Sequence, residues 1–169
     1  AMRKAKEWME EGRIGEVVEV IATFGCPIET FGNSVNNTAH WGNNLSSGGG
    51  SLSQFGCYTV NLAQFVYDQL PEKILGVTET LPREDGADLN SSFILSYEGA
   101  SKHAMLSSSW VARTQSVARI SGTKGEILIG NPFFAPYHAS LYTHKDHIWY
   151  NDLEEAYDDP YEAEKYEGF

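Results

Sequence analysis

The stretch Gly48-Gly-Gly-Ser-Leu-Ser-Gln-Phe-Gly-Cys-Tyr-Thr-Val-Asn61 decides how this sequence is interpreted, because it begins the strongest predicted helix. Side chains that follow its glycines recur at the spacing of one helix face, which predicts a buried stripe. The stripe consists of Leu52, Phe55, Thr59, Leu62 and Val66. Leu70-Pro71 is expected to end the helix, because proline cannot donate the next backbone hydrogen bond.

A second stripe on the same helix is polar. Gln54, Tyr58 and Asn61 stand at positions i, i+4 and i+7, so they share one side of the helix. Gln54 can donate and accept hydrogen bonds, and the Tyr58 hydroxyl can pass a proton. The glycines before the helix expose backbone N–H groups to an oxygen-rich ligand, and Gly56 would let a large group come close. Taken alone, these residues fit either a substrate site or a solvated stripe behind a simple glycine turn.

The rest of the chain predicts one sheet accompanied by few helices. Residues 3–11 predict a short helix ended by Gly12, residues 17–24 a strand, and residues 26–48 a long loop with His40-Trp41 placed to cover a pocket. Alternating patterns then predict strands at 73–80, 92–97, 102–110, 115–121 and 126–130, with weaker ones at 140–143 and 147–150. Because short turns join these strands, we expect an α+β fold with a predominantly antiparallel open sheet and helices on one face.

The second face of this sheet must meet water or another subunit. Leu106, Trp110, Ile127 and Ile129 are apolar side chains that such a face would have to hide. We therefore expect a homodimer formed through the open face.

Composition narrows the classes of protein. With 169 residues and 41% hydrophobic content, the chain fits one domain spanning residues 1–169. The net charge of −11 argues against nucleic-acid binding, and no apolar run reaches the roughly 20 residues of a membrane helix. The acidic residues from 152 to 167 are interpreted as a solvated tail.

The cysteines and histidines indicate neither a disulfide framework nor a metal site. Cys26 and Cys57 have no metal-binding spacing, and without an export signal a cytoplasmic location is expected. His144 and His147 form a loose His-x-x-His pair, and neither His138 nor Asp146 supplies a third ligand at a metal-binding spacing, so we expect no metal.

Residues Gly49 to Asn61 resemble the Gly-Gly-x-Leu-x-Asp-x-Gly-x-His/Tyr-x-x-Asp helix in the carboxy-terminal domain of Gfo/Idh/MocA oxidoreductases. Further landmarks follow in the family's order: residues 12–17, Pro71-Glu-Lys-Ile74, Asp88 and Gly122-Thr-Lys-Gly125. The segment after the helix is most similar to the dihydrodiol and xylose dehydrogenase branch. The resemblance implies a glyceraldehyde-3-phosphate-dehydrogenase-like carboxy-terminal fold.

Members of that family move hydride between NAD or NADP and a sugar, polyol or diol. The resemblance places Tyr58 at the position of the general acid/base, and Gln54 and Asn61 where the family has aspartates. It places Trp41 near a tryptophan that walls the diol pocket. Gly49 and Gly50 would let the substrate come close to the helix.

Two features depart from the family pattern. Gln54 replaces a carboxylate by an amide, which can only hydrogen-bond. The chain also has neither a Gly-x-Gly-x-x-Gly turn nor the family's Glu-Lys-Pro segment with its catalytic lysine. We therefore expect the amino-terminal Rossmann domain to be absent, and the chain alone to bind no cofactor and to be inactive. The alternative is a catalytically silent dimerisation or small-ligand-binding module that kept the fold.

Overall fold

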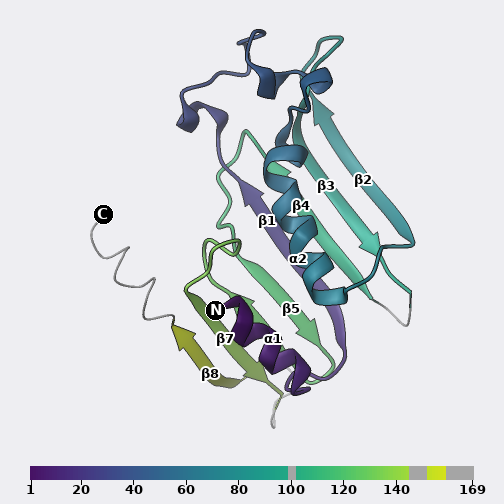
Figure 1. Ribbon diagram of the computed structural model, residues 1–169, viewed down its shortest axis with the longest axis vertical. Coiled ribbons are helices and arrows are strands. Elements are labelled where there is room, and N and C mark those ends of the chain that lie inside the picture. Colours follow the sequence, from purple (N-terminus) through teal and green to yellow (C-terminus); the bar gives the residue numbers. More distant parts are fainter. Residues whose placement is uncertain (99–101, 145–151, 159–169) are drawn as a thin grey trace.

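The computed structural model describes residues 1–98, 102–144 and 152–158, which form a layer of helices on one face of a single sheet (Figure 1). The strand order is β2-β3-β4-β1-β5-β6-β7-β8. The helices are α1 (Met2–Glu10) and α2 (Cys57–Tyr67), and the strands are β1 (Val17–Gly25), β2 (Lys73–Thr80), β3 (Asp88–Ser96), β4 (His103–Ser109), β5 (Ala118–Gly122), β6 (Gly125–Ile129), β7 (His138–Thr143) and β8 (Asp152–Asp158). The predicted α+β class and the open, mostly antiparallel sheet are confirmed.

One pair of neighbouring strands, β1 and β4, runs parallel. After β1 the chain passes through the loop and α2, which returns it along the helix face to the edge strand β2. Two hairpin steps then bring β4 beside β1 in the same direction. The remaining strands β5 to β8 continue on the other side of β1 as an antiparallel series, because short connections join them.

The core lies between the helices and the sheet. Ala5 and Trp8 of α1 are fully buried, and Gly12 follows that helix with a positive φ, as its predicted role required. Leu62 and Ala63 of α2 are buried in the same cluster. On the sheet side this cluster contains Val20, Ala22, Leu95, Ala104, Leu106, Ile120, Ile127, Ile129 and Leu141.

The predicted buried stripe of the long helix is confirmed at its three middle residues, whereas its last residue, Val66, is only partly buried. Phe55, Thr59 and Leu62 are buried, but Leu52 is 40% exposed. The reason is that residues Leu52–Gly56 form a π-helical turn, η4, which winds more loosely than an α-helix and turns Leu52 off the stripe.

The expected role of Gly56 as a point of ligand approach is not what its surroundings show. A Cβ added there would lie 2.7 Å from Leu52 Cδ1 and 3.3 Å from Ser108 Oγ. Gly56 therefore allows the helix to pack closely on β4, and Leu52 and Ser108 cover it from a ligand.

The long loop before η4 is ordered by polar contacts around three short 3-10 turns, at Ile28–Phe31, Trp41–Asn43 and Leu45–Ser47. The buried Asn43 amide donates to the Ser34 and Asn37 carbonyl oxygens, both at 2.8 Å. A loop that is rich in Asn and Ser can thus satisfy its own buried backbone.

The interpretation of the acidic carboxy-terminal stretch as a solvated tail is wrong for its first part. Asp152–Asp158 forms the edge strand β8, antiparallel to β7. Cations from the amino-terminal segment neutralise this strand: Arg13 lies 2.8 Å from Glu154, and Lys4 lies 3.2 Å from Glu155. Residues 159–167 and the predicted strand at 147–150 lie outside the described residues.

The prediction that four apolar residues lie on the open face is also wrong. Leu106, Ile127 and Ile129 point into the core beneath the helices, and Trp110 is buried in a second cluster with Cys26, Ile28 and Phe55. The predicted alternation between two faces along each strand is correct, but the face predicted to be open is the one that the helices cover. Other apolar side chains occupy the open face: Leu75, Val77, Ile94, Val117, Leu128 and Leu153.

Candidate functional site

The glycine turn before the helix is required by contacts within the protein. Gly48 and Gly50 have φ values of 74° and 116°, which other residues adopt only with strain. A Cβ on Gly49 would collide with the Gly42 carbonyl, and one on Gly50 with the Asp88 carboxylate. This packing accounts for both glycines, and their contact with a substrate stays a prediction.

Asp88 connects this turn to the sheet. Its Oδ2 accepts hydrogen bonds from Ser51 Oγ at 2.6 Å, from the Leu52 backbone N–H at 2.8 Å and from Ser91 Oγ at 3.0 Å. Ser51 Oγ is also 3.1 Å from Ser108 Oγ on β4. The start of the helix is therefore tied to β3 and β4 by buried polar groups.

Tyr58 stands on the accessible side of α2, with 43% of its surface exposed. Its ring centroid lies 5.7 Å from that of Phe24 and 5.1 Å from that of Phe134. Sequence analysis did not identify Phe134, because nothing local connects it with a helix that precedes it by some seventy positions. The cis Asn131-Pro132 bond in the turn before it could be recognised from sequence only as a turn.

Tyr58 and Asn61 line the same hollow, of about 300 Å³, between α2 and the amino-terminal end of α1. The other lining residues are Met2, Leu62, Phe65, Phe133 and Phe134. The structure thus brings two of the predicted site residues together, and it adds an aromatic wall to them. None of the lining residues is charged, so a cation that would assist Tyr58 must come from outside this lining.

Gln54 and Trp41 do not line this hollow. Gln54 Nε2 is buried against Gly42, and it has no hydrogen-bond partner among the described residues. Trp41 is 55% exposed and stacks on His40, with the ring centroids 5.8 Å apart. These two predicted residues therefore belong to the loop side of η4, separate from the hollow shared by Tyr58 and Asn61.

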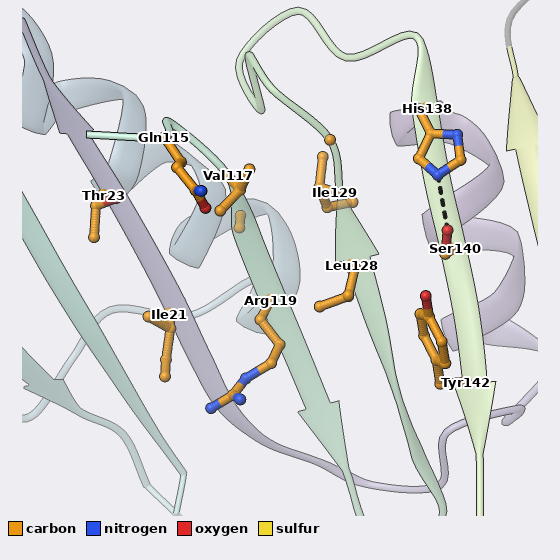
Figure 2. Close-up of a pocket in the computed structure, with 12 residues that line it drawn as sticks. Ile21, Thr23, Gln115, Val117, Arg119, Leu128, Ile129, His138, Ser140 and Tyr142 are labelled. Carbon is orange, nitrogen blue, oxygen red and sulfur yellow. Dashed lines mark hydrogen bonds between the residues drawn. The ribbon is translucent and has the colours of Figure 1, made fainter. Parts of the chain in front are cut away.

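The open face of the sheet carries a different hollow, of about 550 Å³, which Figure 2 shows in close-up. Its walls come from β1, β5, β6 and β7 and are mostly apolar. His138 Nε2 lies 2.8 Å from Ser140 Oγ, and His138 Nδ1 lies 2.6 Å from Asp158 Oδ1. This histidine therefore has two protein partners, and within residues 1–98, 102–144 and 152–158 no three His, Cys, Asp or Glu side chains are grouped to hold a metal ion.

Two dehydrogenases are similar in sequence to most of this chain. Trans-1,2-dihydrobenzene-1,2-diol dehydrogenase of Xenopus laevis is 33% identical over 129 residues, which are 76% of this chain and 36% of that protein. D-xylose 1-dehydrogenase (NADP+) of Haloarcula marismortui is 29% identical over 140 residues, covering 81% of this chain and 38% of that one. The chain thus spans little more than a third of these relatives.

Solved structures show the same fold at low sequence identity. An NAD binding oxidoreductase from Klebsiella pneumoniae superimposes with a TM-score of 0.73 at 22% identity, covering 92% of this chain and 43% of that one. Levoglucosan dehydrogenase in complex with NADH and levoglucosan gives a TM-score of 0.72 at 16% identity, with 90% and 42% covered.

Fold and relatives together define the sheet domain of an oxidoreductase. A family model described as the GFO/IDH/MocA C-terminal domain matches residues 2–128, three quarters of the chain. The chain belongs to this family, as the motif around Tyr58 had indicated, and its curated relatives include both the diol and the xylose dehydrogenases of the predicted branch. No helix among the described residues is long and apolar enough to cross a membrane.

Proposed function

We propose that this chain is the substrate-binding domain of an NAD(P)-dependent oxidoreductase that acts on a sugar, polyol or diol. The observation that carries the proposal is the shared hollow of Tyr58 and Asn61 on the helix that the family motif defines. A phenolic hydroxyl and an amide at one rim offer a proton-transfer group beside a group that can hydrogen-bond a substrate hydroxyl. The aromatic side chains around them can pack on the apolar face of a ring-shaped substrate.

The described residues do not fit a dinucleotide cofactor. A mostly antiparallel sheet provides no βαβ unit with a glycine-rich phosphate turn, which is the usual dinucleotide site. We therefore assign NAD or NADP to a nucleotide-binding domain outside this chain. The step that residues of this chain can perform is proton transfer at the Tyr58 hydroxyl, with Asn61 orienting the substrate. Gln54 and Trp41 would contact only a substrate that extends toward the loop.

Tyr58→Phe tests the assignment. We expect turnover to fall about 100-fold when the chain is joined to a nucleotide-binding domain, because the variant keeps the ring and loses the proton-transfer group. Steady-state kinetics with dihydrodiols and aldoses measures the effect, and Tyr142→Phe on the open face is the matched control. Equal turnover in the Tyr58 variant and the parent protein would refute the role of Tyr58. If the unsubstituted protein binds these compounds without turning them over, the alternative hypothesis of a catalytically silent binding module is favoured.

We further propose that the open face joins two copies of the chain. Leu75, Val77 and Ile94 expose apolar surface on β2 and β3, and Val117 and Leu128 continue it across β5 and β6. A surface of this extent favours a partner, and a second copy offers a self-complementary one.

The thiols of Cys26 and Cys57 are both free, in keeping with the proposed cytoplasmic location.

A further inference from the structure

The helix that carries Tyr58 has no local cap at its beginning. No side chain at its amino-terminal end accepts a hydrogen bond from the first turn, and that turn is the π-helical η4. The first backbone N–H groups of a helix need acceptors, which a neighbouring Ser, Thr, Asp or Asn usually supplies. Here the Leu52 N–H donates a hydrogen bond to the carboxylate of Asp88, which lies 36 positions further along the chain.

Asp88 is itself buried, with 9% of its surface exposed. Its three donors converge on a single oxygen, Oδ2, while Oδ1 faces the Cα of Gly50. Ser51, Ser91 and Ser108 complete a buried network in which the sheet supplies two serines and the helix one. Charge-assisted hydrogen bonds of this kind are stronger than neutral ones, so Asp88 determines where the first turn rests on β3 and β4.

We propose that Asp88 is a positioning residue for Tyr58: it holds the first turn of the helix on the sheet and thereby sets where the Tyr58 hydroxyl lies at the hollow. This inference rests on the proposed function for its consequence in catalysis. Tyr58 lies about one and a half turns beyond the anchored Leu52 on a continuous helix. A change in the seating of the first turn is therefore transmitted to the Tyr58 side chain.

The amide of asparagine replaces this carboxylate only in part. An amide oxygen is neutral, so it accepts the three hydrogen bonds that converge on Oδ2 more weakly than a charged carboxylate oxygen does. The amide nitrogen would take the place of Oδ1 beside the Cα of Gly50, where it would bring two N–H donors in place of an acceptor oxygen. Asp88→Asn therefore keeps the size of the side chain and weakens its hold on the turn.

Asp85 offers a matched control three residues earlier. It is half-buried, and it accepts hydrogen bonds from the Ser46 backbone N–H at 2.8 Å and from Ser46 Oγ at 2.5 Å. It thus anchors the loop before the glycines without touching the helix. Asp85→Asn makes the same chemical change at the same end of β3 and should leave Tyr58 in place.

The test uses the chain itself, labelled with 3-fluorotyrosine, with the Tyr58 resonance assigned by its loss in Tyr58→Phe. In Asp88→Asn we expect the ¹⁹F resonance of Tyr58 to shift or broaden, and amide hydrogen exchange in residues 52–56 to rise about tenfold or more. Asp85→Asn should change neither. If Asp88→Asn does not fold, Ser51→Ala and Ser91→Ala each remove one donor and should move the same resonance by a smaller amount.

An unchanged Tyr58 resonance in a folded Asp88→Asn, or in both serine variants if Asp88→Asn does not fold, would overturn the inference. The kinetic consequence is a lower kcat with little change in KM, because the hydroxyl is displaced while the aromatic wall stays. If Tyr58→Phe has no effect on turnover, the proposed function fails, whereas the resonance still decides whether Asp88 positions Tyr58.

Discussion

The two faces of the sheet are made by the same strands and have opposite characters. On β6, Ile127 is fully buried beneath α1, while Leu128, the next residue, is 37% exposed on the other face. The helix face holds the buried core, with the Tyr58 hollow at one end and a second hollow between α2 and the strands β2 and β3. The open face combines apolar side chains with a central ion pair, in which Arg119 lies 2.8 Å from Glu19. Contiguous exposed apolar surface of this kind is typical of subunit contacts.

The largest difference between the faces should appear in stability. Ile127→Ala leaves a cavity in the core and should lower the free energy of unfolding by about 2–5 kcal/mol. Leu128→Ala should lower it by less than about 1 kcal/mol when the chain is monomeric, because its side chain already contacts water. Urea unfolding at low protein concentration measures both. Equal losses at the two positions would mean that the open face is as closely packed as the core.

A charge on the open face should separate the proposed dimer. Ile94 on β3 is 42% exposed on that face, and its cross-strand partners Leu75 and Met105 are uncharged. Ile94→Asp should weaken association about 100-fold or more, because it buries an unpaired carboxylate. Val60→Asp, on the exposed side of α2, is the control and should leave association unchanged. Sedimentation equilibrium gives the constants, and a parent chain that stays monomeric at high concentration would exclude the dimer.

A smaller effect is expected where the carboxy-terminal end of α2 meets the beginning of β4. Tyr67 donates a hydrogen bond to the His103 carbonyl oxygen at 2.8 Å, and burial raises the pKa of the Tyr67 hydroxyl. Tyr67→Phe should lower the free energy of unfolding by about 1 kcal/mol, because it removes the donor for a partly buried carbonyl. Thermal or urea unfolding at neutral pH tests this, and an unchanged midpoint would show that water replaces the hydroxyl.

The smallest effect concerns pH. The hydrogen bonds that Asp85 accepts, first from the Ser46 hydroxyl and then from the Ser46 amide, lower the pKa of Asp85 below its ordinary value of 3.8. A lowered pKa gives the folded loop an advantage that is present above pH 3.8 and lost as the pH falls through the Asp85 pKa. The Ser46 amide resonance should therefore be constant near neutrality and move only in acid. Asp85→Asn should abolish that acid step, and a step that persists would assign it to another group.

The sequence predicted most of the sheet and the helix that carries the site, because periodicity reports which side of an element is buried. It could not tell which face of the sheet the helices cover. Ile127 and Leu128 differ in burial although both are aliphatic residues on one strand. That choice depends on where Trp8 of α1 comes to rest, which no local pattern encodes.

The errors at β8 and at the site have the same cause. The acidic residues of β8 resemble a solvated tail unless Lys4 and Arg13, some 140 positions earlier, are known to lie beside them. At the site, the family motif identified Tyr58 and Asn61, but it could not show the aromatic wall of Phe133 and Phe134. Nor could it show that a π-helical turn separates Gln54 from the hollow. Local spacing predicts which residues share a helix face, and only tertiary structure shows which of them share a hollow.

The most direct measurement maps where a small ligand binds. Amide chemical shifts of the ¹⁵N-labelled chain can be followed during titration with trans-cyclohexane-1,2-diol and with D-xylose. We expect the changes to concentrate at Tyr58, Asn61 and Phe134 and to disappear in Tyr58→Phe. Changes confined to the open-face hollow, around Val117 and Ser140, would contradict the assignment of substrate binding to the helix face.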